Sequence, residues 1–183
     1  MSDSVCCLDL LQETDKPSRS PFTKFISLNW WDGPIGGLIK CGTCTRSYRF
    51  ELLAQDGGDY EYSSWDEGRD LTIFGLAELD GAHVETIMNV LSEHESPTWP
   101  KWYRGPYRDH SRYERNSRGD GIANTILAQA GKPSLAIAVH MGDLLVEVLQ
   151  SRRIGSDNLI DIPSQQWLEF FGYSKQNHTE DNT

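Results

Sequence analysis

A basic and aromatic run between residues 98 and 118 holds the side chains best suited to bind a ligand. Pro106 has the fixed φ that suits the first position of a helix. In such a helix, arginines spaced by four, four and three residues share one face. Each guanidinium group can bind a phosphate or carboxylate through two parallel hydrogen bonds, and nearby aromatic rings can stack on a flat ligand. The predicted ligand-binding residues are Trp31, Trp102, Tyr103, Arg104, Arg108, Arg112 and Arg115.

A second interpretation pairs the same arginines with acids of this chain. Residues 56–70 contain six Asp and Glu against the single basic residue Arg69. Surface ion pairs of this kind are common and individually weak, worth about 0 to 1 kcal/mol. Both interpretations stay open at this point, because the sequence does not say which way the arginines face.

Catalytic residues are harder to find in this sequence. His110 lies among the arginines, next to Asp109, and Asp32 follows a pair of tryptophans at a turn. These two are weak candidates for handling protons, since neighbours in sequence do not make a catalytic geometry. The chain has no P-loop, GxGxxG, HExxH or GxSxG motif. We therefore expect binding rather than catalysis.

Two of the four cysteines have the spacing of a metal-binding pair. Cys41 and Cys44 have the CxxC spacing of one zinc-binding pair, but tetrahedral zinc needs four ligands. The remaining cysteines, Cys6 and Cys7, are adjacent, which makes them an awkward chelating pair. A redox CxxC normally opens a helix, and this one lies between two expected strands. We therefore expect neither a metal nor a cofactor. If a metal does bind, Cys41 and Cys44 are the candidate ligands, although the signal for them is weak.

The elements that must position these residues follow from hydrophobic patterning. Alternating residues predict an antiparallel meander of strands at FISLNWW, IGGLIK and SYRFELLAQ, followed by LTIFGLAEL and a later hairpin of SLAIAVH with LLVEVLQ. The glycines after Trp31 indicate a bulge or a close backbone approach. Residues 92–121 contain no Ala, Val, Ile, Leu or Met, so this stretch must lie over a core that other segments build. These segments predict an α+β fold with a mostly antiparallel sheet.

About three helices are expected on one face of that sheet. Val84, Ile87, Met88 and Leu91 form one apolar stripe in a helix from about residue 82 to 94, capped by Asp80. Asp120 is the expected cap of a second helix. Pro163 and Ser164 are expected to open a third, with Trp167, Leu168 and Phe171 facing inward. The expected organisation is a flexible arm at residues 1–21, one α+β domain at residues 22–173 with a long Arg/aromatic loop at residues 96–120, and a disordered tail at residues 174–183.

The charge distribution limits the classes of partner. The net charge is −10, of which residues 98–118 contribute +4 and the rest −14. An acidic surface repels nucleic acids and anionic membranes, so general nucleic-acid binding and membrane binding are not expected. The beginning of the chain does not resemble a signal peptide, and no run of eighteen apolar residues occurs, which favours the cytoplasm.

The sequence therefore predicts a non-catalytic cytoplasmic binding or interaction protein. Its acidic body suits a basic protein partner, as an immunity-type or regulatory protein would. The alternative is an enzyme or small-ligand binder that holds an anionic substrate with the Arg-rich arm. Exposed aromatic residues also make a homodimer an open possibility, since aromatic side chains are enriched at interfaces.

Overall fold

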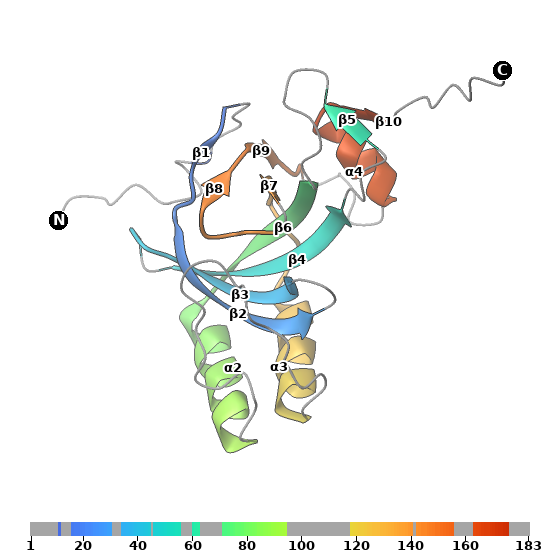
Figure 1. The fold of residues 1–183 in the computed structure, drawn as a ribbon. Helices are drawn as coiled ribbons and strands as arrows, with labels where there is room; N and C mark the ends of the chain where they lie inside the picture. Colours follow the sequence, from blue (N-terminus) through green and yellow to red (C-terminus); the bar gives the residue numbers. More distant parts are fainter. Residues whose placement is uncertain are drawn as a thin grey trace, which may run out of the picture.

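A six-stranded antiparallel sheet is the centre of the computed structural model, which describes residues 11, 16–30, 34–44, 46–55, 60–62, 71–94, 118–140, 142–155 and 163–175. The strands lie in the order β2-β3-β4-β6-β7-β9, so neighbours in the sheet are also successive in the chain apart from the short β5 and β8 (Figure 1). Their bounds are β2 (Phe22–Trp30), β3 (Pro34–Cys41), β4 (Ser47–Gln55), β6 (Leu71–Leu79), β7 (Leu135–His140) and β9 (Gln150–Arg153).

A short strand pair joins the two edges of this sheet. β1 (Ser18–Arg19) directly precedes edge strand β2, and β8 (Glu147–Val148) directly precedes edge strand β9. β1 and β8 pair antiparallel, and the amide of Ser20 donates to the carbonyl of Val146 at 3.0 Å. The sheet is therefore curled, with one face turned inward.

The inward face holds the largest hydrophobic cluster. Tyr48 and Phe50 alternate along β4 and point into it, and Phe50 makes edge-to-face contacts with Phe25 and Phe74 at centroid distances of 6.0 and 5.6 Å. Such pairs add about 0.5 to 1.5 kcal/mol beyond the burial of their area. Leu11 is also buried in this cluster, where its carbonyl accepts a hydrogen bond from Ser151 Oγ. These side chains fill the inside of the curled sheet.

Among the described residues, three helices cover the opposite face in two groups (Figure 1). α2 (Gly81–Glu93) and α3 (Arg118–Gln129) pack side by side over β2 and β3, whereas α4 (Ser164–Phe170) packs over the other end of the sheet. A separate two-stranded sheet of β5 (Tyr60–Tyr62) and β10 (Tyr173–Lys175) lies next to α4. The two helical groups therefore define two ends of the molecule, the α2–α3 end and the α4 end.

One glycine in β3 is required by close backbone packing. A Cβ atom on Gly37 would lie 2.0 Å from the carbonyl oxygen of Ile26, and the β2–β3 register shifts beside it, between Ser27 and Asn29. No side chain fits there, because the strand opposite occupies the space. The close approach that the glycine pair predicts is confirmed.

The α+β class with a mostly antiparallel sheet is confirmed, as are the N-terminal meander and the Asp80 cap of α2. The later hairpin is confirmed as β7 with β9, but its second strand lies further along the chain than expected, because β9 (QSRR) shares only Gln150 with the segment LLVEVLQ. Asp120 is buried inside the first turn of α3 instead of preceding it. β1 and the last two residues of β10 lie outside the range of residues 22–173 that was expected for the domain.

Candidate functional site

The residues predicted to bind a ligand lie outside the described parts of the chain. This holds for Trp31, Trp102, Tyr103, Arg104, Arg108, Arg112 and Arg115, and equally for the catalytic candidates Asp32 and His110. The structure does describe the two helices from which this segment extends. His94, the C-cap of α2, is the last described residue before it, and Arg118 at the start of α3 is the first after it.

Both of these flanking residues lie at the far end of the α2–α3 pair. α2 starts one residue after β6, so its first turn is next to the sheet and its last turn is distant from it. α3 runs the other way, because the carbonyls of its last turn, Leu127 and Ala128, contact Arg49 of β4. A helix of thirteen residues spans about 20 Å. The Arg-rich segment is thus joined to the protein roughly that far from the sheet.

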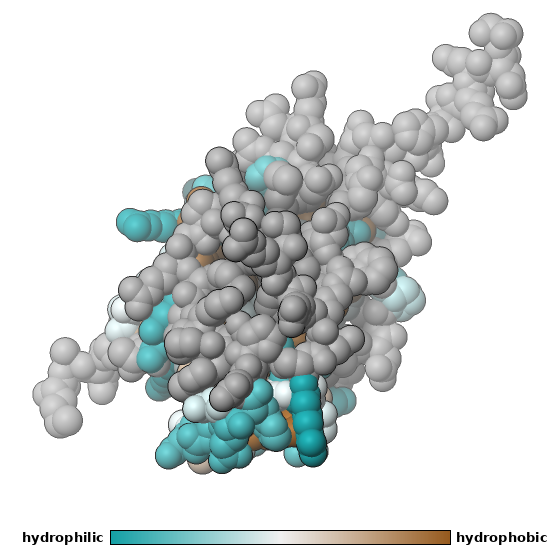
Figure 2. Space-filling view, turned by 60° about the horizontal axis from the view of Figure 1, so that its bottom comes forward, coloured by the Kyte–Doolittle hydropathy of each residue, from teal (hydrophilic) through white to brown (hydrophobic). Residues whose placement is uncertain are grey.

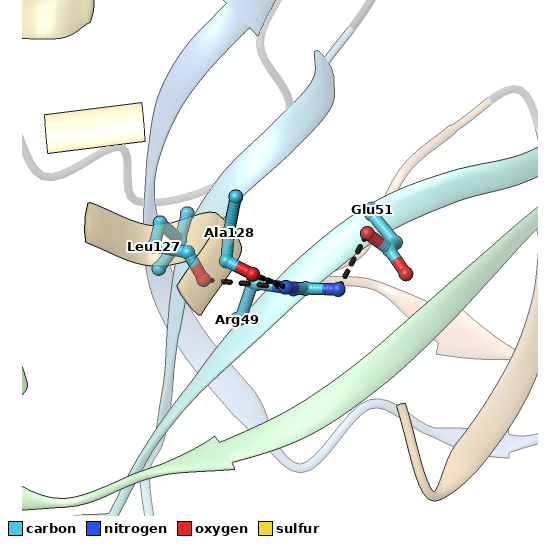
Figure 3. Close-up of polar contacts among 4 residues, drawn as sticks. All are labelled: Arg49, Glu51, Leu127 and Ala128. Carbon is cyan, nitrogen blue, oxygen red and sulfur yellow. Dashed lines mark hydrogen bonds and ion pairs between the residues drawn. The ribbon is translucent and has the colours of Figure 1, made fainter. Parts of the chain in front are cut away.

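A buried arginine fixes α3 on the sheet (Figure 3). Arg49 Nη1 donates to the carbonyls of Leu127 and Ala128 at 3.2 and 3.3 Å, and Nη2 donates to Glu51 Oε2 at 2.6 Å. Only 8% of the Arg49 side chain is exposed, against 31% for Glu51. Carbonyls at a helix C-terminus lack partners within the helix and carry negative partial charge, which a cation offsets.

The surroundings of Arg49 explain its role. In the sheet, Glu51 stands between Gly36 of β3 and Gly75 of β6, so the neighbouring positions contribute no side chain. Arg49 Nε and Glu51 Oε1 are buried without a hydrogen-bond partner. Both terminal nitrogens of the guanidinium group are nevertheless occupied by the protein itself. The pair therefore positions α3, and it does not present a cation to an external ligand.

A carboxylate–imidazole pair lies at the start of α2. Asp80 Oδ1 accepts from the amide of His83 at 2.8 Å, and Oδ2 lies 2.8 Å from His83 Nδ1. The amide hydrogen bond from His83, with the imidazole contact second, holds the pKa of Asp80 below its usual range. Asp80 is largely exposed, with 64% of its side chain accessible. This geometry satisfies a helix N-cap, and the sequence predicted the cap but not the imidazole contact.

Cys41 is the last residue of β3 and Cys44 lies in the turn that follows it, and neither forms a disulfide. Cys41 is buried, and its Sγ accepts from the amides of Thr43 and Cys44 at 3.3 and 3.4 Å. Cys44 is half-buried, with its Sγ 3.9 Å from the hydroxyl of Tyr48. Within the described ranges, no three His, Cys, Asp or Glu residues gather where they could hold a metal ion.

An exposed aromatic side chain marks the α4 end. Phe170 has 46% of its surface accessible and contacts the rings of Trp167 and Phe171 edge-to-face, each at a centroid distance of 5.8 Å. Trp167 and Phe171 are buried against the sheet, and the guanidinium of Arg152 lies 5.7 Å from the Phe171 ring centroid. Phe170 is therefore a partly exposed ring on a rigid support.

The described surface around α2 and α3 is different. Seen from below, it is mostly hydrophilic with a narrow apolar strip (Figure 2). The exposed residues of α2 after its first turn are polar or charged, namely Glu85, Thr86, Asn89, Ser92 and Glu93. Large apolar side chains in this pair face inward, including Ile87, Leu91 and Leu127. The described outer surface of the α2–α3 end is thus polar, whereas the α4 end exposes the ring of Phe170.

The negative charge is distributed unevenly along the chain. The described ranges together contain eleven Lys and Arg against ten Asp and Glu, while the whole chain has 17 against 27. The acidic excess therefore resides in the segments between and beyond the described elements. This finding refines the expectation of an acidic body, because the described framework itself is close to neutral.

Sequence reasoning did not single out Arg49, Glu51 or Phe170. A signal for the first two was present: Tyr48, Phe50 and Leu52 alternate on one face of β4, which sends Arg49 and Glu51 to the helix-covered face. A buried arginine on such a face needs a partner. No comparable signal identified Phe170, since the pattern of α4 specified its inward residues only.

Comparison of the chain with protein-family models, with curated proteins and with solved structures finds no match. No helix among the described residues has the length and apolar character needed to cross a membrane.

Proposed function

We propose that this protein is a non-catalytic binding protein whose α4 end binds a basic protein partner. The observation that carries the proposal is Phe170, a ring exposed on a rigid aromatic base. Protein interfaces are enriched in aromatic residues, and a few buried anchors usually supply most of the binding energy. Among the described residues, Val146 is the other large hydrophobic side chain with high exposure, and it lies in the turn before β8.

Charge supports a basic partner at this end. The chain connects to the α4 end through residues 56–70 around β5, residues 156–162 before α4, and residues 176–183 after β10. These three segments contain ten Asp and Glu against Arg69 alone. Opposite charge on a partner raises the association rate and selects against acidic competitors. The proposed partner therefore carries Lys and Arg around an apolar contact for Phe170.

Affinity capture tests this proposal directly. Immobilised wild-type protein should retain a basic protein from an extract of the source cells, and Phe170→Ser should lose it. The matched control is Val146→Ser, which removes an apolar side chain of similar exposure in the turn before β8 and should retain the partner. Raising the salt concentration from about 0.05 to about 0.5 M should release the partner, because screening weakens exposed charge pairs. An acidic partner, or equal retention by both variants, contradicts the proposal.

A second candidate function, the binding of an anionic ligand by the Arg-rich segment, is favoured by one specific observation. Gln55 and Leu71, which flank the acidic residues 56–70 in the sequence, lie at the end of β4 and β6 opposite to α2. The nine residues of β6 span about 30 Å, and the helix adds about 20 Å. The basic and acidic segments therefore leave the described fold at opposite ends. This arrangement weakens the case for internal pairing of the arginines.

Thermal shift distinguishes this second candidate. Pyrophosphate, citrate and nucleotides should raise the midpoint of unfolding by mass action if the segment binds an anion. Arg108→Ala and Arg112→Ala should abolish the shift, whereas Arg46→Ala, which removes an exposed arginine of the β3–β4 turn, should preserve it. No shift with any of these anions refutes the second candidate and leaves the first untouched.

A further inference from the structure

We propose that Cys41 and Cys44 form a reversible dithiol–disulfide site that reacts with low-molecular-weight disulfides. This inference is independent of the proposed binding function. A redox CxxC normally opens a helix, whose first amides interact with a thiolate. Here the turn supplies amide donors to Cys41 Sγ instead, from Thr43 and Cys44.

The turn brings the sulfur of Cys41 close to the backbone of Cys44. Cys41 Sγ lies 3.4 Å from the backbone nitrogen of Cys44, which is bonded to the Cα that carries the Cys44 side chain. The proposed reaction requires a change of χ1 rotamer at Cys44 that carries its sulfur from Tyr48 toward Cys41. The contact that Cys44 leaves is the 3.9 Å approach of its Sγ to the hydroxyl of Tyr48.

The rest of the turn is held in place. Cys41 N donates to the carbonyl of Arg46 at 3.0 Å, which closes the turn, and Gly42 N donates to the carbonyl of Pro21 at 3.0 Å. A Cβ on Gly42 would lie 2.3 Å from Thr23 Cγ2, so a larger residue there would have to displace the Thr23 side chain of β2. The cysteine spacing is thus fixed by contacts on both sides of the turn.

Burial assigns the two sulfurs different roles. Cys44 is half-buried and therefore accessible, whereas Cys41 is 2% exposed. The Cys44 thiolate attacks one sulfur of oxidised glutathione, forms a mixed disulfide and releases one glutathione thiolate. The Cys41 thiolate then attacks the Cys44 sulfur and releases the second glutathione. Two electrons pass from the protein dithiol to the glutathione disulfide, and the two thiol protons end on the two released glutathione molecules.

Peptide mapping of the native full-length protein tests the site. Trypsin cleaves after Lys40 and Arg46, and it releases residues 41–46 with both cysteines and no others, while Cys6 and Cys7 remain in residues 1–19. The protein is equilibrated with glutathione buffers of increasing oxidised fraction, and free thiols are then alkylated. The 41–46 peptide should pass from doubly alkylated to an internal disulfide, and back again on reduction.

Single variants test the order of attack. Cys41→Ser should accumulate a mixed disulfide at Cys44, at least about tenfold above the wild type, since the resolving thiol is gone. Cys44→Ser should leave the buried Cys41 unmodified under native conditions. Doubly alkylated wild-type peptide across the whole series overturns the proposal. Equal mixed disulfide in the wild type and Cys41→Ser also overturns it, as does protection of both thiols by co-purified zinc.

Discussion

Replacing Arg49 by Met should destabilise the protein far more than replacing Arg46 by Met. Arg49 is 8% exposed and bonds two carbonyls of α3 and the carboxylate of Glu51. Arg46 is 51% exposed and pairs with Glu78 at 3.1 Å. The two variants make the same chemical change, and the affected side chains differ mainly in burial and in their contacts with α3.

The magnitudes follow from that difference. Removing one partner of a buried ion pair leaves the other charge uncompensated and destabilises by about 3 to 5 kcal/mol. Glu51 remains 31% exposed, so we expect about 3 kcal/mol, at the lower end. An exposed pair contributes about 0 to 1 kcal/mol, which is the expectation for Arg46→Met. In a chain of this size the Arg49 variant should lower the Tm by roughly 6 to 12 °C.

Urea denaturation followed by circular dichroism measures both free energies of unfolding. The double variant Arg49→Met, Glu51→Leu should recover part of the lost stability, because it removes the stranded carboxylate along with its partner. Hydrogen exchange in the Arg49 variant should rise first in α3. A loss below about 1 kcal/mol, equal to that of Arg46→Met, refutes the interpretation that Arg49 holds α3 on the sheet.

Three further outcomes are expected. Gly37→Ala should destabilise the protein by more than about 2 kcal/mol, because the added Cβ would overlap the Ile26 carbonyl. Gly121→Ala should stabilise it by about 0.5 to 1 kcal/mol, because the added Cβ meets open space on α3. Thermal denaturation compares the two variants. The pKa of Asp80 is lower in the folded than in the unfolded state, so its contribution to stability is full above the unfolded pKa and disappears as the pH falls through the folded one. Below about pH 4, the free energy of unfolding of Asp80→Asn should therefore decline less steeply with falling pH than that of the wild type. An unchanged decline contradicts this assignment. Trp167→Ala should destabilise by about 3 to 5 kcal/mol, since the ring is 3% exposed, while Phe170→Ala, at 46% exposure, should fall well below that in urea denaturation.

Local patterns predicted most of the elements. The stripe of α2, its Asp80 cap and the inward residues of α4 are fixed within a few residues of sequence, so periodicity and capping rules identify them. The meander was also predictable, because its strands are connected in order and alternate strongly. These features depend on residues that are close together in the sequence, so they can be predicted from it.

Non-local contacts explain what the sequence did not reveal. β9 has the polar sequence QSRR, which does not by itself predict a strand. It forms one because it pairs with β7 at the edge of the sheet and directly follows β8, which is itself paired with β1. Arg49 is separated from Leu127 by 78 residues, so no local pattern links them. The proposed interaction surface is formed in the same way, because β5 and β10 meet only in the folded chain.

The most direct test of the proposed function is to locate the bound partner on the fold. Hydrogen–deuterium exchange of the captured complex should show protection at Phe170 and along β5 and β10, with little change at the far ends of α2 and α3. Protection confined to the α2–α3 end, or no protection at α4, would contradict the proposal that the α4 end binds a basic protein.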